Sequence, residues 1–388
     1  MHYDFDRIVE RRGTNSTKWD QNTLRFGRED VLPMWVADMD FPCPEPVLAA
    51  IKERAEHPTY GYGFPPPSLY EAIINWCQDR YGWKVEKEWI LFTAGVVNAL
   101  YTVVEACSRV GDEIIIQSPV YPPFFNAIRN SGRHVLNSPL VREDDGYRMD
   151  WKDLEKKLSS RRVPLMILCS PHNPVGRVWT KEELTRLSDL CLAHDCLLVS
   201  DEIHCDLVLW ENEHTATAAL SPEVQEKTIT LGAASKTFNL AGLATSYVII
   251  SDPKLREEFA RGRAGRNEGN LFGYIALEAA YRHGGEYLEQ LIGYLEGNMT
   301  VFAESLKEKF PSLKMTLPEA TYLAWVDMRS LGLSPGELQR FMRQEARLAL
   351  NDGHGYGPGG AGFQRFNLGC ARSIVLEAVS RLEQALQG

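Results

Sequence analysis

From about residue 46 to residue 285, the chain alternates between two patterns of apolar positions. Apolar residues recur at helical spacing, three to four positions apart, over 45–57 and 69–81. Between such segments lie short, continuous apolar runs that are typical of buried strands, at 89–92, 113–117, 164–169, 196–200, 228–231 and 245–250. A capping box of Thr180 and Glu183 marks the start of one further helix. Strands that alternate with helices predict an α/β fold, with a mostly parallel sheet flanked by helices on both faces.

The pattern changes after residue 286. The apolar positions there predict a long amphipathic helix at 288–302, a strand at 322–328, a helix at 337–347, a glycine-rich loop at 353–360, a strand around Arg365 and a final helix from about Arg372. This order of helices and strands indicates a smaller α+β domain. Residues 1–45 show no regular period, and their apolar, proline-bounded run at 33–42 is expected to pack against the rest. We therefore predict a large domain of residues 46–285, and a small domain of residues 1–45 and 286–388.

Polar and small residues gather where the predicted strands of the large domain end. Gly95, Tyr121, Asn173 and Asp201 each follow an apolar run, and Lys236 lies in a loop just beyond another. The helix predicted to begin after Gly95 would direct free backbone N–H groups outward, which is the arrangement of an anion site. Ligands of parallel α/β sheets bind outside the carboxyl ends of the strands. The sequence therefore predicts one binding site at this edge.

Lys236 is the most unusual of these residues, because it stands among small residues directly after a buried strand. Burying an ammonium group is costly, and desolvation lowers the pKa of a lysine. The neutral amine can then attack a carbonyl and form a Schiff base. A surface lysine in a strand-to-helix loop is the simpler alternative. The polar residues at the neighbouring strand ends favour the reactive lysine.

Composition limits the functions that remain open. The 388 residues are 44% hydrophobic and 24% charged, as in ordinary globular proteins. A net charge of −10 argues against a general nucleic-acid surface. We expect no signal peptide, because the first residues contain no apolar stretch, and no apolar run approaches the length of a membrane span. The eight cysteines are scattered without a Cys-x-x-Cys pair, which indicates buried thiols of a cytoplasmic protein rather than disulfides or a zinc site.

Several motifs together resemble a known family. They are Asn-Pro-Val-Gly-Arg-Val-Trp at 173–179, Asp-Glu-Ile-His-Cys-Asp-Leu at 201–207 and Ser-Lys-Thr-Phe-Asn-Leu-Ala-Gly-Leu at 235–243, with further matches at 37–41, 321–327 and 365–372. The chain resembles fold-type-I enzymes that use pyridoxal 5'-phosphate (PLP). Within the class I/II aminotransferase superfamily, it is similar to the MalY/PatB branch of cystathionine β-lyases and cysteine-S-conjugate β-lyases. The match covers nearly the whole chain.

The resemblance implies roles for the residues at the strand ends. Lys236 would bind the cofactor covalently and then remove the Cα proton of the substrate. Asp201 would pair with the pyridine nitrogen, Asn173 would donate to the phenolic oxygen, and Tyr121 would stack on the ring. Taken singly, Asp201 could instead cap a helix, Asn173 could be a turn residue before proline, and Tyr121 could lie at the edge of the core.

Further residues follow from the same resemblance. The N–H groups of Val96 and Val97 and the hydroxyl of Ser235 would bind the phosphate. Tyr62 would reach the phosphate of the neighbouring subunit, which implies a homodimer with a shared active site, although a simple turn is the alternative for Gly61-Tyr62-Gly63.

The resemblance also implies how the α-carboxylate of the substrate would be held. Arg365 would grip its α-carboxylate in a bidentate pair, unless it is an ordinary surface arginine, and the backbone at Ala37 would assist. The loop at 353–360 and residues 266–272 are candidates for its distal end.

Three positions depart from or refine the aminotransferase pattern. His204 stands where many aminotransferases have a tyrosine, which favours the lyase branch, although a satisfied core histidine is an open alternative. Ala233 and Ala244 replace a hydroxyl residue and an arginine that often bind the phosphate. The phosphate would therefore depend more on backbone amides and Tyr62. We predict no metal site, because no close ligand spacing accompanies the histidines at 172, 204 and 214.

The resemblance thus implies a cytoplasmic lyase that acts on a small amino acid carrying sulfur on Cβ. Cystathionine would yield homocysteine, pyruvate and ammonia, and homocysteine would feed methionine biosynthesis. An aminotransferase is the nearest alternative. An alternative of another class is a non-catalytic regulator on the same fold, but the first 45 residues lack a helix-turn-helix pattern.

Overall fold

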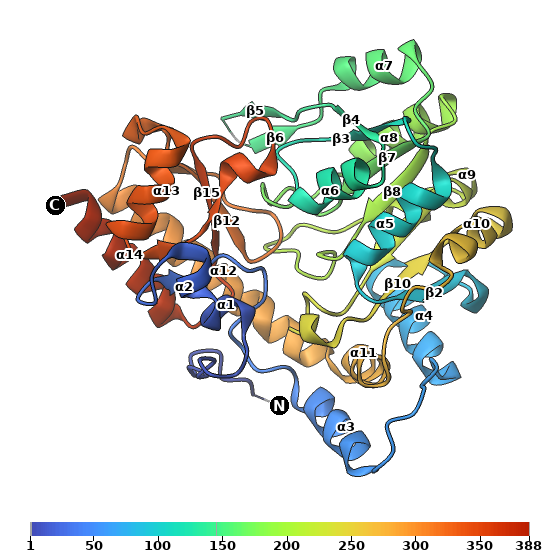
Figure 1. The fold of residues 1–388 in the computed structure, drawn as a ribbon, viewed down its shortest axis with the longest axis horizontal. Helices are drawn as coiled ribbons and strands as arrows, with labels where there is room; N and C mark the ends of the chain where they lie inside the picture. Colours follow the sequence, from blue (N-terminus) through green and yellow to red (C-terminus); the bar gives the residue numbers. More distant parts are fainter. Residues whose placement is uncertain (1, 145, 388) are drawn as a thin grey trace.

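The computed structural model describes residues 2–144 and 146–387. A seven-stranded sheet forms its centre (Figure 1). In spatial order the strands are β2 (Ile90–Thr93), β10 (Ser246–Ile249), β9 (Thr228–Gly232), β8 (Leu197–Asp201), β7 (Leu165–Cys169), β3 (Glu113–Ile116) and β4 (His134–Asn137). Six strands run in one direction, and β10 alone is antiparallel to its two neighbours. The mostly parallel sheet is confirmed. The reversed strand follows from its connection, because residues 233–245 hold only a short 3-10 turn and no crossover helix.

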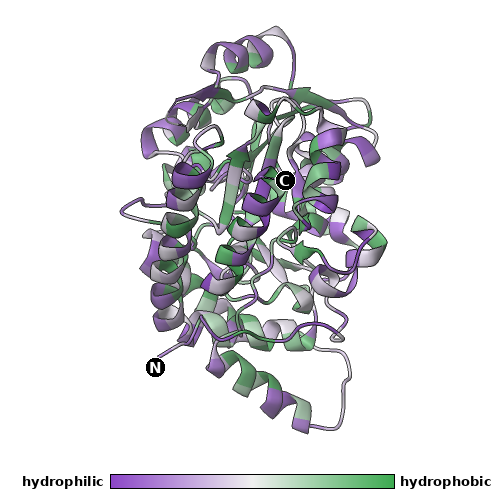
Figure 2. Ribbon diagram, turned by 90° about the vertical axis from the view of Figure 1, so that its left-hand side faces the viewer, coloured by the Kyte–Doolittle hydropathy of each residue, from purple (hydrophilic) through white to green (hydrophobic). Residues whose placement is uncertain are grey.

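Helices cover both faces of this sheet, as the alternation of strands and helices predicts. Ile114 and Ile116 face a core formed with α5 (Val96–Cys107), α6 (Pro122–Asn130) and α10 (Pro253–Arg263). Ile115 points the other way, into a core with α7 (Trp151–Ser160) and α8 (Lys181–Ala193). Successive strand residues point to opposite faces, so a continuous apolar run is needed where both faces are covered. The hydropathy colouring in Figure 2 accordingly shows hydrophobic central strands and hydrophilic outer helix faces.

Five other helices of the described chain lie between residues 45 and 309. They are α3 (Glu45–Glu56), α4 (Pro67–Tyr81), α9 (Pro222–Glu226), α11 (Leu271–His283) and the long α12 (Gly285–Lys309). Of these helices, α3 and α4 pack against α11. The predicted capping box at the start of α8 is confirmed in both halves. The Glu183 N–H donates to Thr180 Oγ1 at 3.2 Å, and the Thr180 N–H donates to Glu183 Oε2 at 2.9 Å.

The C-terminal part of the chain has its own antiparallel sheet. Its spatial order is β11 (Lys314–Met315), β12 (Leu323–Asp327), β15 (Phe363–Asn367) and β14 (Asn351–Asp352). The helices α12, α13 (Pro335–Gln344) and α14 (Arg372–Gln387) accompany it at the left of Figure 1. The strands β5 (Val141–Glu143) and β6 (Gly146–Arg148) pair in antiparallel orientation and form a separate two-stranded sheet (Figure 1).

The N-terminal residues contain more regular structure than expected. The short helices α1 (Thr17–Asp20) and α2 (Asn22–Phe26) precede β1 (Leu32–Pro33), which pairs in parallel with β13 (Leu348–Ala349). The expectation of a wholly irregular segment is therefore wrong. Helices of four and five residues are too short to show a helical period, so the hydrophobic pattern could not reveal them.

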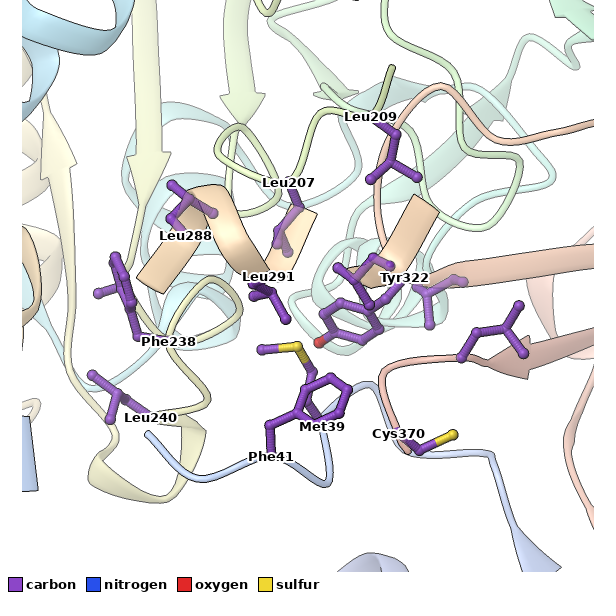
Figure 3. Close-up of a cluster of buried hydrophobic side chains, with 14 of the residues drawn as sticks. Met39, Phe41, Leu207, Leu209, Phe238, Leu240, Leu288, Leu291, Tyr322 and Cys370 are labelled. Carbon is purple, nitrogen blue, oxygen red and sulfur yellow. The ribbon is translucent and has the colours of Figure 1, made fainter. Parts of the chain in front are cut away.

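Segments that are far apart in sequence share one apolar core. Figure 3 shows Met39 and Phe41 from the N-terminal part beside Leu291 of α12 and Tyr322, with Phe238 of the Lys236 loop nearby. All five side chains are at most 3% exposed. This core joins the N-terminal chain, the Lys236 loop and the C-terminal part, and it therefore places the loop against residues 36–41.

Candidate active site

The carboxyl ends of β7, β8 and β9 surround a cavity of about 170 Å³. Nine of the eleven predicted site residues line it: Ala37, Val96, Val97, Tyr121, Asn173, Asp201, His204, Ser235 and Lys236. Six residues that were not predicted as site residues also line it: Gly95, Cys169, Ile203, Ala241, Ala244 and Thr245. A larger hollow of about 470 Å³, near Phe26 and Met342, is lined by none of the eleven. The chemistry-bearing side chains thus converge at the edge that the strand ends predicted.

Lys236 points into this cavity from the loop that follows β9. Its Nζ donates a hydrogen bond to the Ala37 carbonyl oxygen at 2.6 Å, across 199 positions of sequence. Burial, together with the positive charge of Arg365, lowers its pKa from 10.5 to about 8, although Asp38 and Asp201 oppose the shift. An appreciable fraction of the amine is therefore neutral near neutral pH and able to act as a nucleophile or a base.

Asp201 ends β8 and is 3% exposed. Its Oδ1 accepts a hydrogen bond from the Ile203 N–H at 3.2 Å. Burial raises the pKa of its carboxyl from 3.8 to about 7, while the Ile203 N–H and the charge of Lys236 act in the opposite direction. A carboxylate that is costly to ionise alone is well suited to a cationic partner in the cavity.

Asn173 lines the cavity and contacts Arg365, which does not itself line it, although 192 positions separate the two residues. Arg365 Nη1 donates to Asn173 Oδ1 at 3.0 Å, and Nη2 donates to the Trp35 carbonyl oxygen at 2.7 Å. The guanidinium lies over the Tyr356 ring, with 5.4 Å between Cζ and the ring centroid. Arg365 is 2% exposed, so the alternative of a surface arginine is wrong. Because Asn173 accepts through Oδ1, its amide NH₂ is the group that can donate to a ligand.

Two ring side chains complete this part of the site. Burial and the charge of Asp201 raise the pKa of Tyr121 to about 12, so its phenol is protonated. Burial, with the charges of Lys236 and Arg365, lowers the pKa of His204 to about 3. His204 is thus neutral, and its buried Nδ1 has no hydrogen-bond partner among the described residues. A satisfied core histidine would have such a partner, so this alternative does not fit.

The start of α5 forms the other end of the cavity. Val96 and Val97 are its first two residues, and Gly95 before them has a φ of 98°, a conformation that favours glycine. The first N–H groups of a helix have no intrahelical acceptor, so they can bind an anion. Ser235 lies at the same cavity. Ala244, which has a φ of 41°, also lines the cavity. It stands at the position where aminotransferases often have a phosphate-binding arginine.

Some predicted residues do not reach the cavity within one chain. Tyr62 is fully exposed, and Tyr60 and Phe64 beside it are 61% and 75% exposed. The loop at 353–360 and residues 266–272 are absent from the described lining of the cavity. The loop contributes indirectly, since the Tyr356 ring packs against Arg365. Over residues 2–144 and 146–387, no group of three or more His, Cys, Asp or Glu side chains could hold a metal ion.

Three residues that support the site were not singled out as site residues. The Trp35 carbonyl oxygen orients Arg365. Tyr322 donates its hydroxyl hydrogen to the Ala37 oxygen at 2.8 Å, and Asp38 acts electrostatically on Lys236. Trp35 lies in the apolar run at 33–42, and Asp38 and Tyr322 lie in motifs that resemble the family. No local pattern assigns such roles, because each depends on a contact between distant segments.

Comparison with known proteins agrees with this geometry. Residues 29–382 match the family model "Aminotransferase class I and II". The chain is 45% identical to cystathionine beta-lyase PatB of Bacillus subtilis, over 99% of this chain and 100% of that protein. Among solved structures, cystalysin from Treponema denticola, which contains a PLP cofactor, has a TM-score of 0.96 and 36% identity. The alignment covers 100% of this chain and 99% of cystalysin.

A PLP-bound C-S lyase from Staphylococcus hominis has a TM-score of 0.93 and 32% identity, over 100% of this chain and 99% of that one. These matches run the length of the chain, so they include every segment that builds the cavity. The resemblance read from the motifs is confirmed. The chain belongs to the aminotransferase class I and II family.

Proposed function

We propose that this protein is a PLP-dependent carbon–sulfur β-lyase. It would convert cystathionine, or another cysteine S-conjugate, and water into a thiol, pyruvate and ammonia. The observation that carries the proposal is the cavity that brings together Lys236, Asp201 and Asn173, in a chain 45% identical to a protein named cystathionine beta-lyase.

The residues of the cavity fit PLP. The buried Asp201 carboxyl, whose raised pKa calls for a cationic partner, suits the pyridine nitrogen, and the unpartnered Nδ1 of His204 lies at the same cavity. The N–H groups of Val96 and Val97, with Ser235, would bind the phosphate. Tyr121 would cover the ring, and the amide NH₂ of Asn173 would donate to its phenolic oxygen. When bound, PLP supplies an electron sink for negative charge at the substrate Cα.

Lys236 would act twice in the reaction. Its amine would first hold the cofactor covalently and then, once free, take the proton from the substrate Cα. A pKa of about 8 suits a base that works near neutral pH. The sulfur on Cβ would leave as a thiolate, and the remaining carbon skeleton would hydrolyse to pyruvate and ammonia.

Arg365 would hold the substrate. Its contacts to Asn173 and Trp35 fix the plane of the guanidinium, which would present a fork to the α-carboxylate. The backbone at Ala37 would assist. This grip would keep the Cα proton within reach of Lys236, since Asn173, which contacts Arg365, lines the same cavity as Lys236.

The wider organisation belongs to the same proposal. The exposed aromatic residues Tyr60, Tyr62 and Phe64 favour a homodimer in which Tyr62 reaches the phosphate in the partner's site. All eight cysteines are free thiols, which supports a cytoplasmic protein. Among the described residues, no helix is both long and apolar enough to cross a membrane. The pairing of β1 with β13 supports a small domain of residues 1–45 and 286–388 beside a large domain of 46–285.

An aminotransferase remains the second candidate, because the matched family bears that name and shares this chemistry. The deciding assay supplies purified enzyme with cystathionine and no keto acid, and measures free thiol and pyruvate. Equal amounts of both are expected, and Lys236→Ala should form neither. Thiol and pyruvate formation that requires a keto acid would refute the lyase. Turnover that is unchanged in Lys236→Ala would refute the assigned role of the lysine. No turnover of any amino acid would favour the non-catalytic regulator.

A further inference from the structure

Residues 36–41 run past the cavity between the Lys236 loop and the C-terminal sheet, and we call them the 36–41 segment. Their side chains alternate in direction. Met39 and Phe41 lie in the apolar core with Tyr322 (Figure 3), whereas Asp38 and Asp40 join a cluster of charges. The segment is therefore anchored on both of its faces.

The charge cluster consists of Arg11, Lys18, Asp38 and Asp40. Arg11 bridges the two carboxylates, at 2.8 Å to Asp38 and 2.6 Å to Asp40. Lys18 Nζ lies 2.6 Å from Asp40, and the lysine is fully buried. Trp19 Nε1 also donates to Asp40, at 2.9 Å. Charges are rarely buried unless they are paired, and removing one partner leaves the other unsatisfied. The cluster thus sets the position of the segment with little freedom.

The backbone of the segment is held by two asparagines. Asn239, three residues after Lys236, bonds both the N–H and the C=O of Met39, at 3.0 and 2.8 Å. Asn367 of β15 donates to the carbonyl oxygens of Val36 and Asp38 at 2.5 and 2.6 Å. These contacts hold Ala37, which lies between Val36 and Asp38, from both sides. One asparagine ties the segment to the Lys236 loop, and the other ties it to the strand of Arg365.

The Ala37 carbonyl oxygen is the functional end of this arrangement. It accepts hydrogen bonds from Lys236 Nζ at 2.6 Å and from the Tyr322 hydroxyl at 2.8 Å. We propose that the Arg11–Lys18–Asp38–Asp40 cluster and Tyr322 are positioning residues, which hold the Ala37 carbonyl as the acceptor that orients the amine of Lys236 whenever this amine is free. This inference rests on the proposed function for its kinetic consequence but not for the contact itself.

The orientation matters because a lysine side chain is long and flexible. A base works efficiently only when its lone pair lies along the line of proton transfer, and a fixed acceptor removes most of the other rotamers. Asp38 adds a charge effect, since its carboxylate favours the ammonium form of Lys236. The other charged or titratable groups that face Lys236 are Asp201, His204, Tyr121, Tyr322 and Arg365.

Two readouts separate orientation from charge. The first is the pH dependence with which formaldehyde and cyanoborohydride methylate Lys236 in the cofactor-free protein, measured by mass spectrometry. Asp38→Asn should lower the pH midpoint, because it removes a negative charge. Tyr322→Phe should leave the midpoint in place, because it changes no charge. The second readout is the isotope effect on kcat with substrate deuterated at Cα. It should rise in Tyr322→Phe and Asp40→Asn, with kcat about tenfold lower and KM within about twofold of wild type, because only the orientation of the base is lost.

Asp327→Asn is the matched control. Its carboxylate also bridges two cations, Arg142 at 2.9 Å and Arg329 at 2.8 Å, and it is as buried as Asp40, with 10% of each side chain exposed. It does not line the cavity. This variant should keep the wild-type midpoint and isotope effect, and Asp38→Glu, which retains the negative charge, should keep the wild-type midpoint that Asp38→Asn loses.

Several outcomes would overturn the inference. One is a wild-type midpoint in Asp38→Asn. Another is a wild-type isotope effect in both Tyr322→Phe and Asp40→Asn. Equal changes of the midpoint and the isotope effect in Asp327→Asn would mean that both readouts respond to a general loss of stability rather than to the position of Ala37. If Asp40→Asn fails to fold, Tyr322→Phe still decides the matter. A wild-type enzyme that releases no thiol would refute the proposed function, while the methylation midpoint would still test the contact.

Discussion

Replacing Asp201 by asparagine should stabilise the cofactor-free protein while it disables the loaded enzyme. The carboxyl has a pKa of about 7 in the folded chain, against an ordinary value of 3.8. A difference of about three pKa units corresponds to about 4 kcal/mol that the fold loses when Asp201 ionises. Asparagine carries no charge and has the same shape. Its Oδ1 can also keep the hydrogen bond from Ile203 that the structure shows at 3.2 Å.

The effect depends on pH with a definite sign. Below pH 3.8 the carboxyl is neutral in both folded and unfolded chains, so no cost arises. As pH rises from 3.8 to 7, the unfolded chain loses its proton while the folded chain retains it, and folding becomes less favourable. Asp201→Asn should therefore raise the free energy of unfolding by about 4 kcal/mol at pH 8 but only by about 2 kcal/mol at pH 5.

Urea denaturation of the cofactor-free wild type and variant at pH 5 and pH 8 measures both values. Asp327→Asn provides a control of opposite sign. Burial by itself raises the pKa of Asp327, but the hydrogen bonds from Arg329 and the charges of Arg329 and Arg142 outweigh it and hold this pKa below 3.8. That substitution should destabilise the protein above pH 4, and the loss should vanish as pH falls. An equal gain for Asp201→Asn at both pH values would refute the reasoning about burial. With PLP bound, kcat of Asp201→Asn should fall at least about 100-fold, and wild-type kcat would refute the role at the ring nitrogen.

Three further outcomes are expected. Arg365→Lys replaces the planar fork by a point charge, so KM should rise about 10- to 100-fold with a smaller change in kcat, measured by steady-state kinetics; an unchanged KM would contradict the substrate grip. Mixing inactive Tyr62→Ala with inactive Lys236→Ala should restore part of the activity through hybrid dimers with one intact site, and no recovery despite subunit exchange would argue against a shared site. Leu291→Ala should lower the free energy of unfolding by about 2–5 kcal/mol, because Leu291 is fully buried in the core of Figure 3. Leu376→Ala, at a 49% exposed position, is the control and should change the free energy of unfolding by less than about 1 kcal/mol in the same denaturation assay.

The pattern of the sequence was sufficient where the determining forces are local. The apolar runs at 164–169 and 196–200 became β7 and β8, because strands covered on both faces need continuous apolar residues. The capping box at Thr180 identified the start of α8 from two side chains three positions apart. Parallel strands end at one edge of a sheet, and for this reason the order of residues along the chain was enough to assign Asn173 and Asp201 to one cavity.

The motifs also directed attention to the residues of the cavity. Nine of the eleven predicted residues line it within one chain. The other two illustrate the limits of the pattern. Arg365 is held behind the cavity by Asn173 and Trp35, whereas Tyr62 lies on the surface, and its role stays a prediction about the homodimer.

Only the tertiary structure decided how distant segments meet. The amine of Lys236 contacts the Ala37 carbonyl across 199 positions, and the fully buried Lys18 ends in an ion pair with Asp40. The reversal of β10 was equally hidden, since an apolar run carries no sign of strand direction. Local periodicity shows which face of a helix or strand is buried, but it does not show which other segment of the chain covers that face. The pKa of Lys236, the plane of Arg365 and the position of the 36–41 segment all depend on partners that packing alone brings together.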